Sequence, residues 1–112
     1  MALDVRESIA QITRREVEAY AGGCANCRLM RIADDERQIY VVIAIPDDKA
    51  MRPTWTTVCA RVVGGYIVIE EDTYIDKPLV DALMVNAGIP RDRIILAYKG
   101  ETLPAETSSS IS

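Results

Sequence analysis

Three cysteines are the side chains of this 112-residue chain whose type and spacing come closest to a reactive site. Cys24 and Cys27 stand three positions apart, which is a spacing found in redox pairs and in half of a zinc site. A structural zinc site needs four ligands, yet the sequence has no histidine and Cys59 is the one other cysteine. We therefore predict three free thiols and no zinc, with a redox or metal role for Cys24 and Cys27 as the alternative.

A cluster of carboxylates is the second feature that could carry chemistry. Glu70, Glu71 and Asp72 are consecutive, and Asp76 follows soon after. Such clusters can hold Mg²⁺ or Ca²⁺, but the spacing is not that of an EF-hand loop. We predict solvated acids at the end of a strand, with Asp76 as the N-cap of the next helix, and a metal site as the alternative. The lack of histidine excludes histidine-based catalytic triads, so we predict no catalytic residue and no cofactor.

Composition and charge indicate one globular domain. Hydrophobic residues make up 49% of the chain and charged residues 27%, and the net charge is −4. That charge disfavours contact with nucleic acid or an acidic membrane. No apolar run approaches the roughly 20 residues of a membrane span, and an odd number of cysteines fits a reducing compartment. We expect a cytoplasmic protein, with a domain over residues 1–100 and a mobile polar tail over residues 101–112.

The elements that position these side chains follow from periodicity and turn residues. Residues 4–20 predict a helix that Asp4 and Glu7 cap and that Gly22–Gly23 ends. Strands are predicted over residues 27–33, 37–45, 54–63, 66–70 and 93–98, and a helix over about 78–87. A glycine pair, Gly64–Gly65, predicts a tight hairpin. The expected fold is α+β: an N-terminal helix, an antiparallel β-meander of four strands, a helix and a final strand.

The second helix has its own stripe of apolar residues and its own stop signal. The stripe comprises Leu79, Val80, Leu83, Met84 and Ala87. Gly88 is expected to end the helix in the left-handed conformation, Ile89 to pack back on it, and Pro90 to block its continuation.

The C-terminal half contains Ala87-Gly88-Ile89-Pro90, then the charged turn Arg91-Asp92-Arg93 and the strand Ile94-Ile95-Leu96. In these motifs it resembles the XisI family, the fdxN element excision controlling factor. Asp35-Glu36-Arg37, ahead of Tyr40-Val41-Val42, matches a further family stretch, and the resemblance spans residues 9–99. These motifs are turns, caps and core positions, so they carry no chemistry. The chain departs from the family where Glu71-Asp72-Thr73 lacks a glycine and where Gly64–Gly65 replaces Asp-Gly.

This resemblance implies a non-enzymatic accessory or regulatory factor. Family members act in excision of a DNA element in heterocyst-forming cyanobacteria, beside a recombinase and a partner called XisH. An XisH-like protein is therefore the expected partner, in site-specific recombination. Two alternatives come from the residues: direct DNA binding through Arg6, Arg14 and Arg15 of the first helix, and a small thiol- or metal-dependent enzyme.

A partner surface is predicted from the aromatic residues. Tyr40, Trp55, Tyr66 and Tyr98 supply more aromatic strand surface than one helix covers, and tyrosine and tryptophan are favoured interface anchors. We take these four as the candidate interface. The edges of a small open sheet also favour pairing between copies, so we expect a homodimer or higher oligomer. No membrane contact and negligible DNA affinity are expected.

Overall fold

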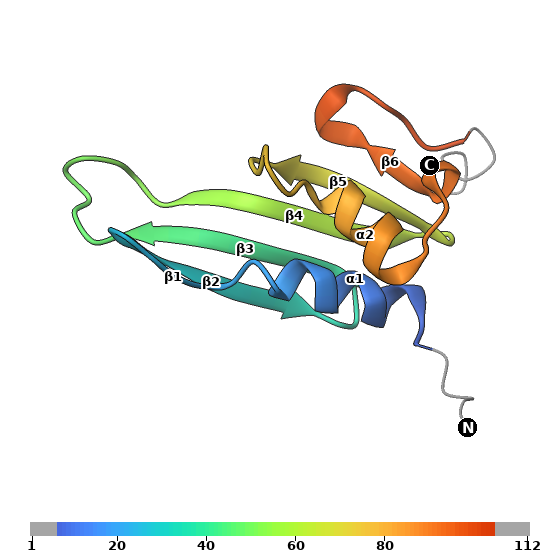
Figure 1. The fold of residues 1–112 in the computed structure, drawn as a ribbon, viewed down its shortest axis with the longest axis horizontal. Coiled ribbons are helices and arrows are strands. Elements are labelled where there is room, and N and C mark those ends of the chain that lie inside the picture. Colours follow the sequence, from blue (N-terminus) through green and yellow to red (C-terminus); the bar gives the residue numbers. More distant parts are fainter. Residues whose placement is uncertain (1–6, 105–112) are drawn as a thin grey trace.

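The computed structural model describes residues 7–104, which form one sheet and two α-helices (Figure 1). The elements in chain order are α1 (Ile9–Glu18), β1 (Gly22–Cys24), β2 (Cys27–Asp34), β3 (Ile39–Pro46), β4 (Trp55–Val63), β5 (Tyr66–Asp72), α2 (Leu79–Ala87), η1 (Arg91–Arg93), β6 (Ile94–Leu96) and η2 (Ala97–Lys99), where η marks a 3-10 helix. Six strands lie in the sheet in chain order. Neighbours from β1 to β5 are antiparallel, and β6 is parallel to β5.

The α+β class, the two helices and the long strands are confirmed, but the predicted four-stranded meander is inexact. The four strands of the predicted meander are β2 to β5, and the predicted final strand is β6, which lies beside β5 and runs parallel to it. The sheet adds the short strand β1 on the other side, which was not predicted. β6 is parallel because α2 carries the chain back across the sheet before β6 begins, as a crossover connection does. The Gly64–Gly65 turn has φ of 54° and 83°, the positive values that a primed hairpin turn needs.

Both helices cover the same face of the sheet, and the core lies between them and it (Figure 1). Val17 of α1 and Leu79 and Leu83 of α2 are fully buried. They meet a layer of strand residues that includes Tyr40, Val42, Val58, Ala60, Ile67, Ile69, Ile94 and Leu96. The other face of the sheet has no helix among residues 7–104.

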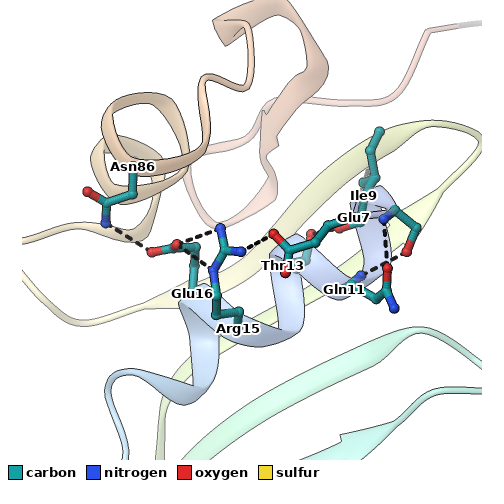
Figure 2. Close-up of polar contacts among 8 residues, drawn as sticks. Glu7, Ile9, Gln11, Thr13, Arg15, Glu16 and Asn86 are labelled. Carbon is teal, nitrogen blue, oxygen red and sulfur yellow. Dashed lines mark hydrogen bonds and ion pairs between the residues drawn. The ribbon is translucent and has the colours of Figure 1, made fainter. Parts of the chain in front are cut away.

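Ser8, rather than Asp4, caps α1. Its hydroxyl accepts from the Gln11 N–H at 3.1 Å, and the Gln11 side chain accepts from the Ser8 N–H at 2.8 Å, which completes a capping box (Figure 2). The predicted helix start was therefore too early, and Asp4 itself lies outside the described residues. Glu7, the predicted partner of Asp4, instead pairs with Arg15.

A buried carboxylate joins the two helices. Glu16 is 7% exposed, and it accepts hydrogen bonds from the Asn86 side chain of α2 at 3.0 Å and from Arg15 at 3.2 Å (Figure 2). Glu7 completes the chain of charges through its contact with Arg15. Because a buried charge is costly unless it is paired, this network favours one relative placement of α1 and α2.

Asp72, rather than Asp76, holds the start of α2. One of its carboxylate oxygens accepts from the Leu79 N–H at 2.7 Å and the other from the Tyr74 N–H at 2.9 Å. Pro78 occupies the cap position and has no side chain able to cap. The sequence pattern missed this role because Asp72 belongs to the preceding strand and reaches the helix across a loop.

The predicted stop of α2 is confirmed. Gly88 has φ of 69°, in the left-handed region, and the Ile89 N–H donates to the Leu83 carbonyl at 3.1 Å. Ile89 is 8% exposed, so it packs back as expected. Met84 is 38% exposed, so it was wrongly assigned to the buried stripe.

Truncation of the central core residue of α2 should destabilise the protein strongly. Leu83→Ala removes a fully buried side chain and should lower the free energy of unfolding by about 2–5 kcal/mol. Gly88→Val should also destabilise, because a β-branched residue resists positive φ. Denaturant unfolding measures both, with Val85→Ala, at an 81% exposed position of the same helix, as the control. Equal unfolding curves for Leu83→Ala and Val85→Ala would contradict this account of the core.

Candidate functional site

The sheet face opposite the helices is apolar at its centre and lacks helical cover; we call it the open face. Register and alternation place these apolar side chains on three neighbouring strands: Met30 and Ile32 of β2, Ile39, Val41, Ile43 and Ile45 of β3, and Cys59 of β4. Charged side chains border them on the same face: Arg28 and Asp34 at the two ends of β2, and Arg61 of β4, which pairs with Glu70. Met30 is 45% exposed and Ile32 50% exposed. Large contiguous apolar surfaces are uncommon on monomers, so this face is a candidate contact surface.

The chain after β6 covers one side of the open face. Thr102 and Leu103 border the same hollow as Val68 and Ile95, which are 2% and 8% exposed. Glu101 fastens this segment, because its carboxylate accepts from the Leu96 N–H at 2.8 Å. The uncovered part of the open face is therefore the part that β2, β3 and β4 present.

A backbone N–H and a guanidinium keep the Glu101 carboxylate in place. The hydrogen bond from the Leu96 N–H, together with the Arg91 guanidinium at 2.7 Å, lowers the pKa of Glu101 below its ordinary value. Residues 105–112, which complete the predicted tail, lie outside the described residues.

A second surface lies where the sheet extends past the helices (Figure 1). There a hollow of about 670 Å³ opens between the β1–β2 turn and the loop that joins β3 to β4. Its lining consists of Cys24, Ala25, Asn26, Cys27, Pro46, Asp47, Asp48, Met51, Arg52 and Trp55. The Asp47 N–H donates to the Asn26 carbonyl at 2.9 Å, which joins the two loops.

Trp55 is the aromatic wall of this hollow. The Arg52 guanidinium carbon lies 3.6 Å from the centre of the indole ring, close enough for a cation–π contact. Met51 beside it is 81% exposed. The prediction selected Trp55 but missed Met51 and Arg52. These two residues lie between Pro46 and Pro53, in a segment that was predicted to be a connecting loop without a function.

The prediction of three free thiols is wrong for two of them. Cys24 and Cys27 form a disulfide, with 5.2 Å between their Cα atoms, and Cys59 is free. The reason is strand β1, which the prediction read as loop. Cys24 and Cys27 are facing partners in a two-residue hairpin, and this brings their Cα atoms within the range that a disulfide spans.

The four predicted interface aromatics do not form one surface. Tyr40 is 1% exposed and belongs to the core, so its assignment to an interface is wrong. Burial raises the pKa of Tyr40, and its hydroxyl donates to Asp35 at 3.3 Å. Tyr98 packs against the core from η2, while Tyr66 lies under the Arg93 guanidinium at the far end of the sheet. Trp55 alone borders the hollow.

Two members of the acidic cluster, Glu70 and Asp72, make structural contacts. Asp72 holds the start of α2, and Glu70 pairs with Arg61 at 2.6 Å. Within residues 7–104, no group of three or more cysteine or acidic side chains is placed to hold a metal ion. That the protein binds no metal stays a prediction.

The arginines of α1 are paired with carboxylates. Arg14 contacts Glu18 at 2.9 Å and Asp35 at 2.5 Å, and Arg15 contacts Glu7 and Glu16. Arg6, the third arginine of the DNA-binding alternative, lies outside the described residues. Neither α-helix of residues 7–104 has the length and apolar character to cross a membrane.

The architecture defines a class: a small α+β protein with two helices on one face of a six-stranded mixed sheet. The family described as XisI protein matches residues 3–108, so this chain belongs to the XisI family. No curated protein matches it.

Two solved structures from Anabaena variabilis ATCC 29413 share the fold. A XisI-like protein is 19% identical with a TM-score of 0.66, and the alignment covers 89% of this chain and 90% of that one. The fdxN element excision controlling factor XisI is 26% identical with a TM-score of 0.58, and the alignment covers 88% of this chain and 89% of that one. The expected family and its α+β fold are thus confirmed.

Alkylation followed by intact mass measurement should find one reactive thiol in the protein without reductant. That thiol is Cys59, which should react slowly because burial raises its pKa and depletes the thiolate. Addition of reductant should expose three thiols. Cys24→Ser is the matched control, since it should leave Cys27 free and give two labels without reductant. Three labels on the unreduced parent would contradict the disulfide.

Proposed function

We propose that this protein is a non-enzymatic accessory factor in excision of a DNA element, and that it acts by binding a partner protein of the XisH-like kind. Support comes from its membership of the XisI family and from a neighbour, 26% identical, named the fdxN element excision controlling factor. We place it in the cytoplasm, where such DNA resides.

The observation that carries the partner proposal is the hollow around Trp55. Tryptophan, methionine and arginine are enriched at the centres of protein interfaces. Here Met51, Arg52 and Trp55 stand together at an end of the sheet that the helices do not cover. Arg52 lies against the indole ring and so restricts the ring's movement, which lowers the entropy cost of binding. The hollow receives an apolar side chain of the partner.

Charge favours a basic partner segment. Asp47 and Asp48 border the hollow, and the whole chain carries a net charge of −4. Opposite charges speed encounter and set orientation more than they add affinity. A nuclease-like or recombinase-associated protein with a basic surface fits this charge.

The ion pairs of α1 weigh against direct DNA binding. Arg14 and Arg15 would have to leave their carboxylate partners before they contacted phosphate, and those acids would then lie next to the DNA. Glu16 among them is buried and bonded to Asn86, so it cannot move aside. The thiol-enzyme alternative uses Cys24 and Cys27, which line the hollow as a disulfide.

Substitution of Trp55 should abolish capture of the partner. In co-expression with an XisH-like protein, the parent should co-elute with it on size exclusion, while Trp55→Ala should bind at least about 30-fold more weakly, as the loss of a central aromatic anchor does. Ile75→Ala is the control, since Ile75 is 91% exposed and lies beside α2 rather than at the hollow. It should bind as the parent does.

Two further measurements separate the alternatives. A DNA mobility shift at low salt should show negligible binding by this chain alone. Cys24→Ser, with and without reductant, tests whether the disulfide matters for binding, because thiols of the cytoplasm reduce exposed disulfides. Failure of the parent to co-elute, together with tight and salt-sensitive DNA binding, would overturn the partner proposal.

A further inference from the structure

We propose that the uncovered part of the open face packs against the same face of a second copy of this chain, with the two sheets stacked face to face. This contact is separate from the Trp55 hollow, which lies on the other side of the sheet. It goes beyond the proposed function, since the protein could bind a partner as a monomer or as a dimer.

The central side chains of the open face are apolar, so a contact that shields them from water is favourable. The centre of this face is the β3 column Ile39, Val41, Ile43 and Ile45, with Met30 and Ile32 beside it on β2. Each exposed apolar side chain that a neighbour covers contributes stability in proportion to the area removed from water. Stacked sheets bury such columns against one another at a spacing of about 10 Å.

The charges of β2 fit a two-fold contact. Along the open face, this strand presents Arg28, Met30, Ile32 and Asp34 in order, so that a cation stands at one end and a carboxylate at the other. A two-fold axis perpendicular to the strands places Arg28 opposite Asp34 of the second copy, and Met30 opposite Ile32 of the second copy. A self-complementary patch of this kind is what a symmetric dimer interface requires.

Hydrogen bonds within the chain fix the position of the Asp34 carboxylate, which pairs with Arg28 of the second copy in the proposed dimer. Asp34 accepts hydrogen bonds from the Arg37 backbone and side chain, both at 3.0 Å, and these lower the pKa of its carboxyl. It is therefore charged over the ordinary pH range. The Asp34 side chain is itself 37% exposed, so its carboxylate remains accessible.

The uncovered part of the open face has the size of a weak interface. Three strands of eight or nine residues form it, β2, β3 and β4. With strands about 4.8 Å apart and about 3.3 Å per residue, it measures about 400 Å² in each copy. Two copies together cover about 800 Å², which is in the range of weak interfaces, so the dimer should dissociate on dilution.

A charge placed on the open face should separate the copies. By analytical ultracentrifugation over a concentration series, the parent should sediment with twice the mass of one chain. Ile32→Lys should weaken self-association by at least about 100-fold, because a buried unpaired ammonium is costly. Ile32 is 50% exposed in the single chain, so folding should tolerate the change, which circular dichroism verifies. Ile75→Lys, the same change at a 91% exposed site outside the open face, should remain dimeric.

A charge swap tests the two-fold arrangement itself. Arg28→Asp and Asp34→Arg should each weaken the dimer about tenfold, since a two-fold axis repeats the pair. The double variant should recover the parent's affinity. Additive weakening in the double variant would overturn the proposed register.

Cys59 reports which surface is buried. It lies on the open face, so its alkylation without reductant should slow as the protein concentration rises through the dimerisation range. A dimer joined along the exposed edge of β2 would leave Cys59 accessible. A rate independent of concentration, or a parent that is monomeric at every concentration, would overturn the proposal, and neither result bears on capture of the partner through Trp55.

Discussion

The two α-helices are too few to cover both faces and both ends of a six-stranded sheet. This shortage of helical cover determines which parts of the sheet are buried and which are exposed. α1 and α2 lie on one face and bury Val17, Leu79 and Leu83 against the strands. The sheet extends past them at the end where β3 turns into β4, and its other face is apolar without helical cover. The covered region supplies the stability, because burial of apolar area is the main favourable contribution to folding. The surfaces left over are the ones available for contact with other molecules.

Much of this arrangement could be predicted from local signals. Gly64–Gly65 and Gly88 are positions where the backbone needs positive φ, so they located a hairpin and a helix end correctly. The features that were missed depend on contacts between distant residues. β1 has three residues, and its pairing depends on the facing Cys24 and Cys27. Asp72 caps a helix that begins seven residues later.

The interface prediction failed in part for a physical reason. β3 is apolar on both faces, so alternation alone cannot tell which face the helices cover. Tyr40 belongs to the covered face and is buried, whereas the isoleucines of the same strand face outward. Trp55 was selected because a tryptophan in a strand next to a loop is typical of an edge or interface residue, and the structure places it at a hollow. That it contacts a partner stays a prediction. The number of charges in the sequence could not predict that the arginines of α1 pair with acids. The partner Asp35 of Arg14, for example, lies in the turn after β2 and is far from α1 in the sequence.

The two uncovered surfaces allow a division of roles within an XisI family protein. In the proposed arrangement, the open face joins two copies, and the Trp55 hollow of each copy remains free for a partner. Native mass spectrometry of the complex with an XisH-like protein tests this division most directly. The account predicts two copies of this chain in each complex for the parent, and one copy, still bound to the partner, for Ile32→Lys. A parent complex that holds a single copy of this chain, or an Ile32→Lys chain that no longer binds the partner, would contradict it.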